Sequence, residues 1–315
     1  MSALDKEFVF VIGAPRSGTT WLHHMLAEHP SVAAMSGEEL TVFSRYLAPW
    51  ATNFQLEKRN RDEGRWAQGL PCLYTEPEFE QRMLTFVEDV YSRVLLRRAD
   101  ATHILDKHPN YSNHLPLIDR LLPKSRFIHI IRDGREVAVS MMSVNKRVGH
   151  SPAHVRESAR EWHRCVTNAR VDGARLGSAR YTEIRYEDLK DRTSERFSEL
   201  LKFCGLATDD GFAARIAKEH DIQVRQVSRG DSGLNALRAQ PDRIWKERMS
   251  TEQRWIFDRM AGRSLRDLGY AQHGWWATGA GDRLRMLPYG LASRTIRTLK
   301  SLRSIWGSPV EEQLK

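Results

Sequence analysis

The stretch from Phe8 to Leu22 constrains the fold of this chain most, because an apolar run breaks there into a small-residue loop and then a helical pattern. Residues 8–12 are all apolar, as in a buried strand, and Gly13 and Gly18 follow at GxxxxG spacing. Small residues at this spacing let successive backbone N–H groups point at phosphate oxygens. The pattern predicts a strand, a phosphate-binding loop and a helix.

The loop lacks the lysine that follows the second glycine in nucleoside triphosphatases. Thr19 stands at that position, and the loop carries its positive charge earlier, on Arg16. In those proteins the lysine reaches the β and γ phosphates of the nucleotide. We therefore expect this loop to bind a phosphate-like group that does not belong to ATP.

Strand and helix patterns alternate along much of the chain, which is typical of a parallel sheet covered by helices. We predict an α/β, P-loop-like three-layer fold whose ligand lies at the carboxyl ends of the strands. Residues 53–82 are rich in charged and aromatic residues without a clear period, and we expect them to form a loop that closes over the site. The other expected elements are a helix at 19–28, a strand and turn at 102–109, a helix at 115–122, a strand at 126–131, a helix from about 136, and a strand that runs into a helix at 179–189.

Charge and cysteine content narrow the functional classes. The net charge of +9 suits an anionic partner, but the arginines are spread along the chain and no nucleic-acid-binding motif occurs, so we exclude nucleic acid. The three cysteines lack CxxC spacing, which argues against a disulfide framework or a cysteine-based zinc site. Without an apolar stretch of membrane-spanning length or a signal-peptide pattern, we expect a cytoplasmic protein.

Three polar turns follow one another in a telling order: the phosphate loop, Lys107 after the second strand pattern, and an Arg-Asp-Gly-Arg turn at 132–135 with Ser140 eight residues past Arg132. Together they resemble the sulfotransferases that use 3′-phosphoadenosine 5′-phosphosulfate (PAPS). The resemblance covers residues 8–270. Within the family, the segments 33–39 and 106–107 are similar to the tyrosylprotein and carbohydrate branch.

This resemblance implies where PAPS, and its product 3′,5′-adenosine bisphosphate, would bind. Arg132 and Ser140 would hold the 3′-phosphate, and Tyr186 would lie near the adenine. Arg229, in a turn that departs from the family pattern, would close over the 3′-phosphate. The 5′-phosphosulfate would be held by Pro15, Arg16, Ser17, Gly18, Thr19 and Thr20.

Sulfuryl transfer is an in-line displacement in which the protein mainly positions the reactants and neutralises charge. Arg16 and Lys107 would supply positive charge near the bridging oxygen. The acceptor hydroxyl must lose its proton to a base within hydrogen-bond reach, for which Glu39 is the first choice, with Glu38 and His108 as alternatives. No cluster of metal-ligand residues occurs at suitable spacing, so no metal is expected.

We therefore expect a PAPS-dependent sulfotransferase with a small-molecule or glycolipid acceptor, and favour a carbohydrate or glycolipid hydroxyl over a peptide tyrosine or a phenol. Residues 45–100, with Trp50, Trp66 and Tyr74, are expected to build the acceptor pocket together with loops after residue 145. A small-molecule kinase with a degenerate phosphate loop and a non-catalytic nucleotide-binding module are the alternatives.

The composition shifts after the core, which predicts a sulfotransferase domain at 1–270 and a basic amphipathic extension at 271–315. Such a helix docks on its own domain or a partner subunit more often than on lipid. Docking is therefore the first expectation. A homodimer and a peripheral contact with the inner membrane face stay open as alternatives.

Overall fold

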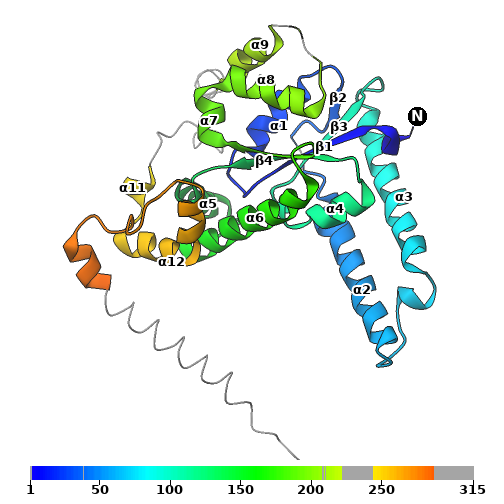
Figure 1. Cartoon of the computed structure of the whole chain (residues 1–315), viewed down its shortest axis with the longest axis horizontal. Helices are drawn as coiled ribbons and strands as arrows, with labels where there is room; N and C mark the ends of the chain where they lie inside the picture. The colour runs from blue at the N-terminus through cyan, green and yellow to red at the C-terminus, as the bar shows by residue number, and fades with distance from the viewer. Residues whose placement is uncertain (1, 38, 208, 210, 222–243, 287–315) are drawn as a thin grey trace, which may run out of the picture.

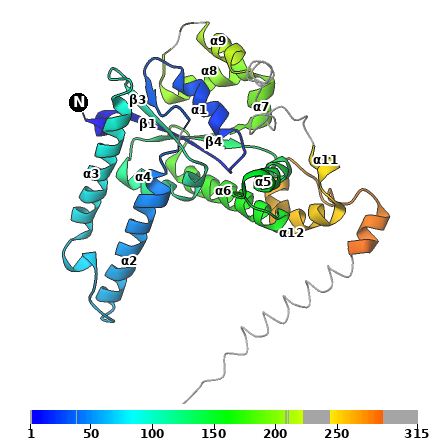
Figure 2. The same cartoon turned by 180° about the vertical axis from the view of Figure 1, so that it is seen from behind.

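The structure is a computed structural model that describes residues 2–37, 39–207, 209, 211–221 and 244–286 (Figures 1 and 2). Glu38, Arg229 and residues 287–315 of the predicted C-terminal extension lie outside these residues, so their expected roles stay predictions. Within the described part, no helix is long and apolar enough to cross a bilayer.

A five-stranded parallel sheet in the order β2-β3-β1-β4-β5 forms the centre of the molecule and confirms the predicted fold class. β1 is the middle strand and pairs with β3 and β4, so Val11 lies beside Lys107 and Ile12 beside His129. The strands therefore end together, which brings the turns after them to one edge. Their bounds are β1 Glu7–Ile12, β2 Val32–Ala34, β3 His103–Lys107, β4 Arg126–Ile131 and β5 Tyr181–Arg185.

Alternation along β1 gives each face of the sheet its own core, because successive side chains of a strand point to opposite faces. Phe8 and Phe10 join the cluster that α3 and α4 cover, whereas Val9 and Val11 join the cluster under α1, α8 and α9. Figure 1 shows these two helical layers on opposite sides of the sheet. The bounds are α1 Thr19–Ala27, α3 Glu76–Leu95, α4 Leu115–Leu121, α8 Thr193–Cys204 and α9 Phe212–Glu219.

A third cluster lies around the helices that follow β4, where Trp162 is fully buried. It is built by α5 Gly134–Val148, α6 Val155–Leu176, α11 Trp245–Arg248 and α12 Thr251–Asp267. The remaining elements are η1 Ala3–Asp5, the π-helical turn η2 Val42–Leu47, α2 Ala48–Asp62, the 3-10 turns η3 Leu70–Cys72 and η4 Pro109–Asn113, and α7 Tyr186–Asp191.

The prediction of a loop over residues 53–82 is wrong. α2 and α3 occupy most of this stretch and project from the body as a two-helix arm (Figures 1 and 2). Phe54 and Asn60 are the buried residues of α2. This solvated helix therefore has no apolar stripe from which it could be predicted. α3 begins with a capping box formed by Thr75 and Glu78.

Candidate functional site

The phosphate loop requires glycine at both ends because neighbouring groups approach its backbone closely. A Cβ atom at Gly13 would lie 2.4 Å from the carbonyl oxygen of Ile130, and one at Gly18 would lie 2.6 Å from the Tyr186 ring. Gly18 also has a φ of +100°, which L side chains rarely adopt. The predicted loop is therefore present, clamped between β4 and the start of α7.

Arg16 is held in a left-handed conformation, with φ at 72°, which is uncommon for a residue other than glycine. Its Nε donates to Ser140 Oγ at 3.2 Å, and Arg132 Nη1 donates to the carbonyl oxygen of Arg16 at 3.3 Å. Such strain costs about 1–3 kcal/mol and gathers at functional sites. Residues predicted for opposite ends of PAPS thus meet here.

Ser17 supports an anion site at this loop, because its hydroxyl is buried and has no hydrogen-bond partner within the described part of the chain. α1 starts directly after Gly18, and no side chain caps its first N–H groups. Free N–H groups at a helix start favour negative charge. Thr19 and Thr20 form the first turn of this helix, so the predicted phosphate contacts fit the loop.

Lys107, at the end of β3, joins the phosphate loop to the predicted base. Its ammonium donates to Glu39 Oε1 at 2.6 Å and to Thr20 Oγ1 at 3.2 Å. The Lys107 side chain is 2% exposed and that of Glu39 is 37% exposed, so the carboxylate lies between a buried cation and solvent. The structure therefore brings together three residues that are far apart in the sequence.

His108 contacts the other carboxylate oxygen of Glu39. Its Nε2 lies 3.4 Å from Glu39 Oε2, and its Nδ1 lies 3.2 Å from Ser44 Oγ. Burial lowers the pKa of His108, although Glu39 opposes this effect, and the Lys107 and Arg45 charges add to the decrease. His108 thus lies between Glu39 and Ser44. The sequence did not predict the contact with Ser44.

Asp106 anchors the end of β3 from the opposite face of the sheet. Tyr91 and Tyr111 donate to its Oδ2 at 2.6 and 2.9 Å, and the Lys107 N–H donates to its Oδ1 at 2.7 Å. Burial raises the pKa of Asp106, while these three hydrogen bonds oppose the rise. The network holds the backbone from which the Lys107 side chain extends. The contacts of the two tyrosines with Asp106 were not predicted from the sequence.

Arg132 stacks its guanidinium 4.4 Å from the centre of the Tyr186 ring. Trp162 Nε1 donates to the carbonyl oxygen of Arg132 at 3.0 Å and so fixes the turn after β4. Tyr186 begins α7 and is itself buried against Gly18 and Trp21. The adenine role expected of Tyr186 stays a prediction.

Arg135, the second arginine of the same turn, has a structural place. It is buried, it pairs with Asp133 at 2.6 Å, and its guanidinium lies 4.0 Å from Trp245 and 4.8 Å from Trp275. These contacts bind α11 and the segment after α12 to the start of α5. Of the two arginines in the turn, Arg132 therefore borders the phosphate loop, and Arg135 holds the helices behind it.

No group of three or more potential metal ligands occurs within the described ranges. The site instead consists of a phosphate loop without a lysine and, beside it, the cluster of Glu39, Lys107 and His108. Both lie at the edge of the parallel sheet where its strands end. This combination defines a protein that binds a phosphorylated group and can accept a proton next to it.

The chain belongs to the Sulfotransferase family, whose sequence model matches residues 9–210. The family inferred from the order of the motifs is thereby confirmed. The crystal structure of a mouse sulfotransferase complexed with PAP is similar in fold, with a TM-score of 0.53 at 16% identity over 85% of this chain and 90% of that one.

Two curated relatives carry more specific names. Protein-tyrosine sulfotransferase 2 of Gallus gallus is 24% identical over 84% of this chain and 67% of its own length. Protein-tyrosine sulfotransferase 1 of Danio rerio is 26% identical over 71% of this chain and 61% of its own length. The chain thus spans about two thirds or less of the length of these relatives.

Proposed function

We propose that this chain transfers the sulfuryl group of PAPS to an acceptor hydroxyl, with Glu39 as the general base. The observation that carries this proposal is the position of Lys107, which contacts both Glu39 and Thr20 of the phosphate loop. A base and an anion site that share one buried ammonium are close enough for a single in-line displacement. Membership of the sulfotransferase family supports the same reaction.

In this reaction the acceptor oxygen bonds to sulfur while the bond from sulfur to the bridging phosphate oxygen breaks, and 3′,5′-adenosine bisphosphate leaves. Glu39 takes the proton of the acceptor, and its partly exposed carboxylate is reachable from solvent. Lys107 and Arg16 offset the negative charge that grows on the leaving oxygen. The PAP in the mouse sulfotransferase is the corresponding product, which supports PAPS as the donor.

For the acceptor we propose a phenolic hydroxyl of the tyrosine type, which was the second choice from the sequence. The names of the two curated relatives support this class. A phenol also suits a carboxylate base better than a sugar hydroxyl does, because its proton is far more acidic, with a pKa of about 10. Carbohydrate and glycolipid acceptors are the alternative that the experiment tests against this proposal.

Calorimetry with 3′,5′-adenosine bisphosphate, and separately with ATP and Mg²⁺, tests the donor site. We expect binding of the bisphosphate and none of ATP, and the reverse result would support the kinase alternative. Labelled PAPS is then offered with a tyrosine peptide, a simple phenol and a set of sugars. Transfer to the sugars alone would overturn the phenolic acceptor and restore the carbohydrate prediction.

A further inference from the structure

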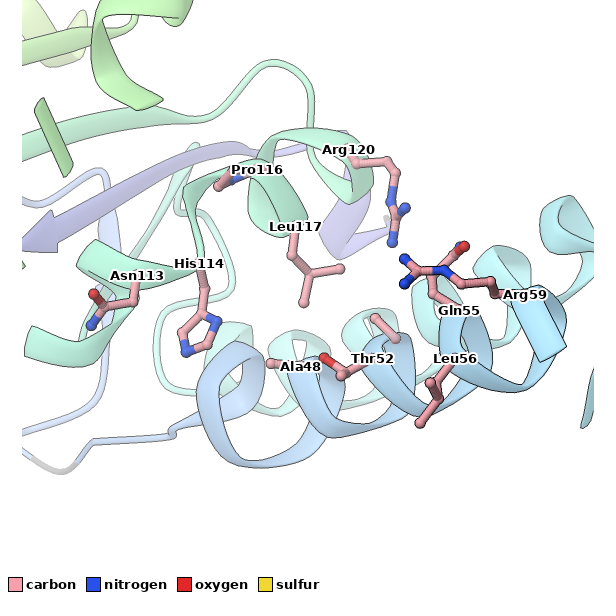
Figure 3. A pocket seen from close by; sticks show the side chains of 11 residues that line it. Ala48, Thr52, Gln55, Leu56, Arg59, Asn113, His114, Pro116, Leu117 and Arg120 are labelled. Atoms are coloured by element: carbon pink, nitrogen blue, oxygen red, sulfur yellow. The ribbon is translucent and has the colours of Figure 1, made fainter. Parts of the chain in front are cut away.

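A pocket of about 550 Å³ lies between α2 and α4, outside the cluster around Glu39 (Figure 3). Figure 3 shows Ala48 and Thr52 of α2 facing Leu117 of α4 across it. This volume is within the range of small-molecule sites. Trp50, Trp66 and Tyr74, which were expected to build the acceptor pocket, do not line this one.

Two arginines from different helices meet at one end of the pocket. Figure 3 shows the side chains of Arg59 from α2 and Arg120 from α4 at the same end of the pocket. Positive charge at this end of the pocket attracts the negatively charged end of a ligand. The planar guanidinium matches a carboxylate through paired hydrogen bonds.

Ion pairs near the arginine end of the pocket do not include Arg59. Glu76 lies 3.1 Å from Lys58 and 3.8 Å from Arg120, and Glu80 lies 3.0 Å from Arg120. Glu76 and Glu80 thus pair with Lys58 and Arg120, whereas within the described part of the chain Arg59 has no ion-pair partner. The unpaired charge belongs to a side chain that lines the pocket.

The remainder of the wall is largely apolar, with Ala48, Ala51, Pro116 and Leu117 among the lining residues. Apolar area that a ligand covers contributes about 25 cal/mol per Å². Such a wall binds a hydrocarbon body better than it binds a sugar. A ligand that fits both the apolar wall and the arginine end has an apolar body and an anionic end, and is therefore an amphiphile.

The opposite end of the pocket points back to the catalytic cluster. Asn113 and His114 line it, and they stand at the end of η4, which begins directly after His108. Backbone hydrogen bonds join the two ends of this turn, because the Tyr111 N–H donates to the carbonyl oxygen of His108 and the His114 N–H donates to that of Tyr111. The pocket is therefore placed to hold the part of an acceptor that trails away from Glu39.

We infer that the α2/α4 pocket binds an apolar chain ending in a carboxylate, and that this chain is the part of the acceptor remote from its reacting hydroxyl. The inference rests on the proposed sulfuryl transfer and narrows its acceptor to amphiphilic carboxylic acids that carry a phenol. Arg59 and Arg120 hold the carboxylate, and Leu117 contacts the chain.

Binding of decanoate to the full chain, measured by calorimetry with 1-decanol as the neutral counterpart, tests the pocket without any turnover. We expect saturable binding of decanoate that Arg59→Gln weakens by about tenfold or more, as for the loss of a charged hydrogen bond. Arg93→Gln is the matched control, since Arg93 is an exposed arginine of the same arm that pairs with Asp89 and does not line the pocket.

Thr52→Phe offers a second variant, because Thr52 is exposed and a larger ring there fills the pocket without disturbing the core. It should abolish decanoate binding while 3′,5′-adenosine bisphosphate binds as in the parent chain. Equal affinity for decanoate and 1-decanol, or decanoate binding that neither variant changes, would overturn the inference. So would displacement of decanoate by a glutamate-rich peptide that binds more tightly, since the pocket would then serve a peptide.

Kinetics then connect the pocket with transfer. A phenol linked to an alkanoic acid should have a KM about tenfold below that of its amide, and Arg59→Gln should remove this difference with kcat retained. If decanoate binds but the acid and the amide react alike, the pocket is no acceptor site. If neither phenol reacts while decanoate binds, the proposed function fails instead.

Discussion

The region around the phosphate loop is tightly packed, whereas the two-helix arm exposes large apolar side chains to solvent. Around the loop, Gly13 and Gly18 leave no room for a Cβ, Arg16 is strained, and Lys107 is 2% exposed. On the arm, Trp66 is 52% and Leu73 is 76% exposed. Tight packing suits a donor that is always the same, and an open arm suits an acceptor that must enter and leave.

The largest effect that this contrast predicts is that of Glu39→Gln. The amide keeps the size of the side chain but cannot accept the acceptor proton, so transfer should fall by about 10²–10⁴-fold. Affinity for 3′,5′-adenosine bisphosphate, measured by calorimetry, should stay as in the parent chain. An unchanged transfer rate would move the role of base to His108 or Glu38.

The histidine part of the acid sensitivity should come from outside the arm, because residues 48–100 contain no histidine. Burial lowers the pKa of His23 from 6.5 to about 3, with Lys107 and His24 adding to the effect, and burial likewise lowers that of His129 to about 3. Between pH 6.5 and 3 the unfolded chain therefore binds protons that the folded chain does not. Each histidine should remove about 2 kcal/mol of unfolding free energy when the pH falls from 7 to 5.

Urea denaturation of His23→Leu at the two pH values measures this effect. The difference in unfolding free energy between pH 7 and pH 5 should shrink by about 2 kcal/mol relative to the parent chain. A surface variant, His150→Gln, serves as the control. If His23→Leu has the same pH dependence as the parent, His23 is protonated in the folded protein and the buried environment is not what the contacts indicate.

Arg132→Ala should weaken binding of 3′,5′-adenosine bisphosphate by about 10–100-fold, the usual loss for a charged hydrogen bond to phosphate. Calorimetry measures the affinity, and a melting curve shows whether the stacking on Tyr186 mattered for the fold. Undiminished affinity would show that the 3′-phosphate is held elsewhere.

The smallest effect should follow from Leu73→Ser at the end of the arm. Because Leu73 is 76% exposed, its replacement should change the unfolding free energy by less than about 0.5 kcal/mol and leave nucleotide affinity as it was. Urea denaturation provides the measurement. A loss above about 1 kcal/mol would mean that the arm is as tightly packed as the phosphate loop, and the comparison between the two sides would not hold.

The elements around the phosphate loop were also predicted from the sequence more accurately than those of the arm. The sequence located β4 to the residue and α1 to within one residue, since both have buried faces with regular periods. It missed the strand β2, which is three residues long, and the helix α2, which has little buried surface. Short or solvated elements leave a weak hydrophobic pattern, and their partners are fixed by tertiary contacts.

The sequence by itself determined the phosphate loop and the family, and it supplied Glu39, Lys107 and Arg132 as candidate site residues, because polar turns follow buried patterns at characteristic spacing. Only the tertiary structure decided that His108 contacts both Glu39 and Ser44, and that Asp106 accepts hydrogen bonds from Tyr91 and Tyr111. It also created the pocket between α2 and α4. Local patterns encode a strand, its turn and its helix, whereas contacts between distant segments depend on the strand order and on which helices pack together.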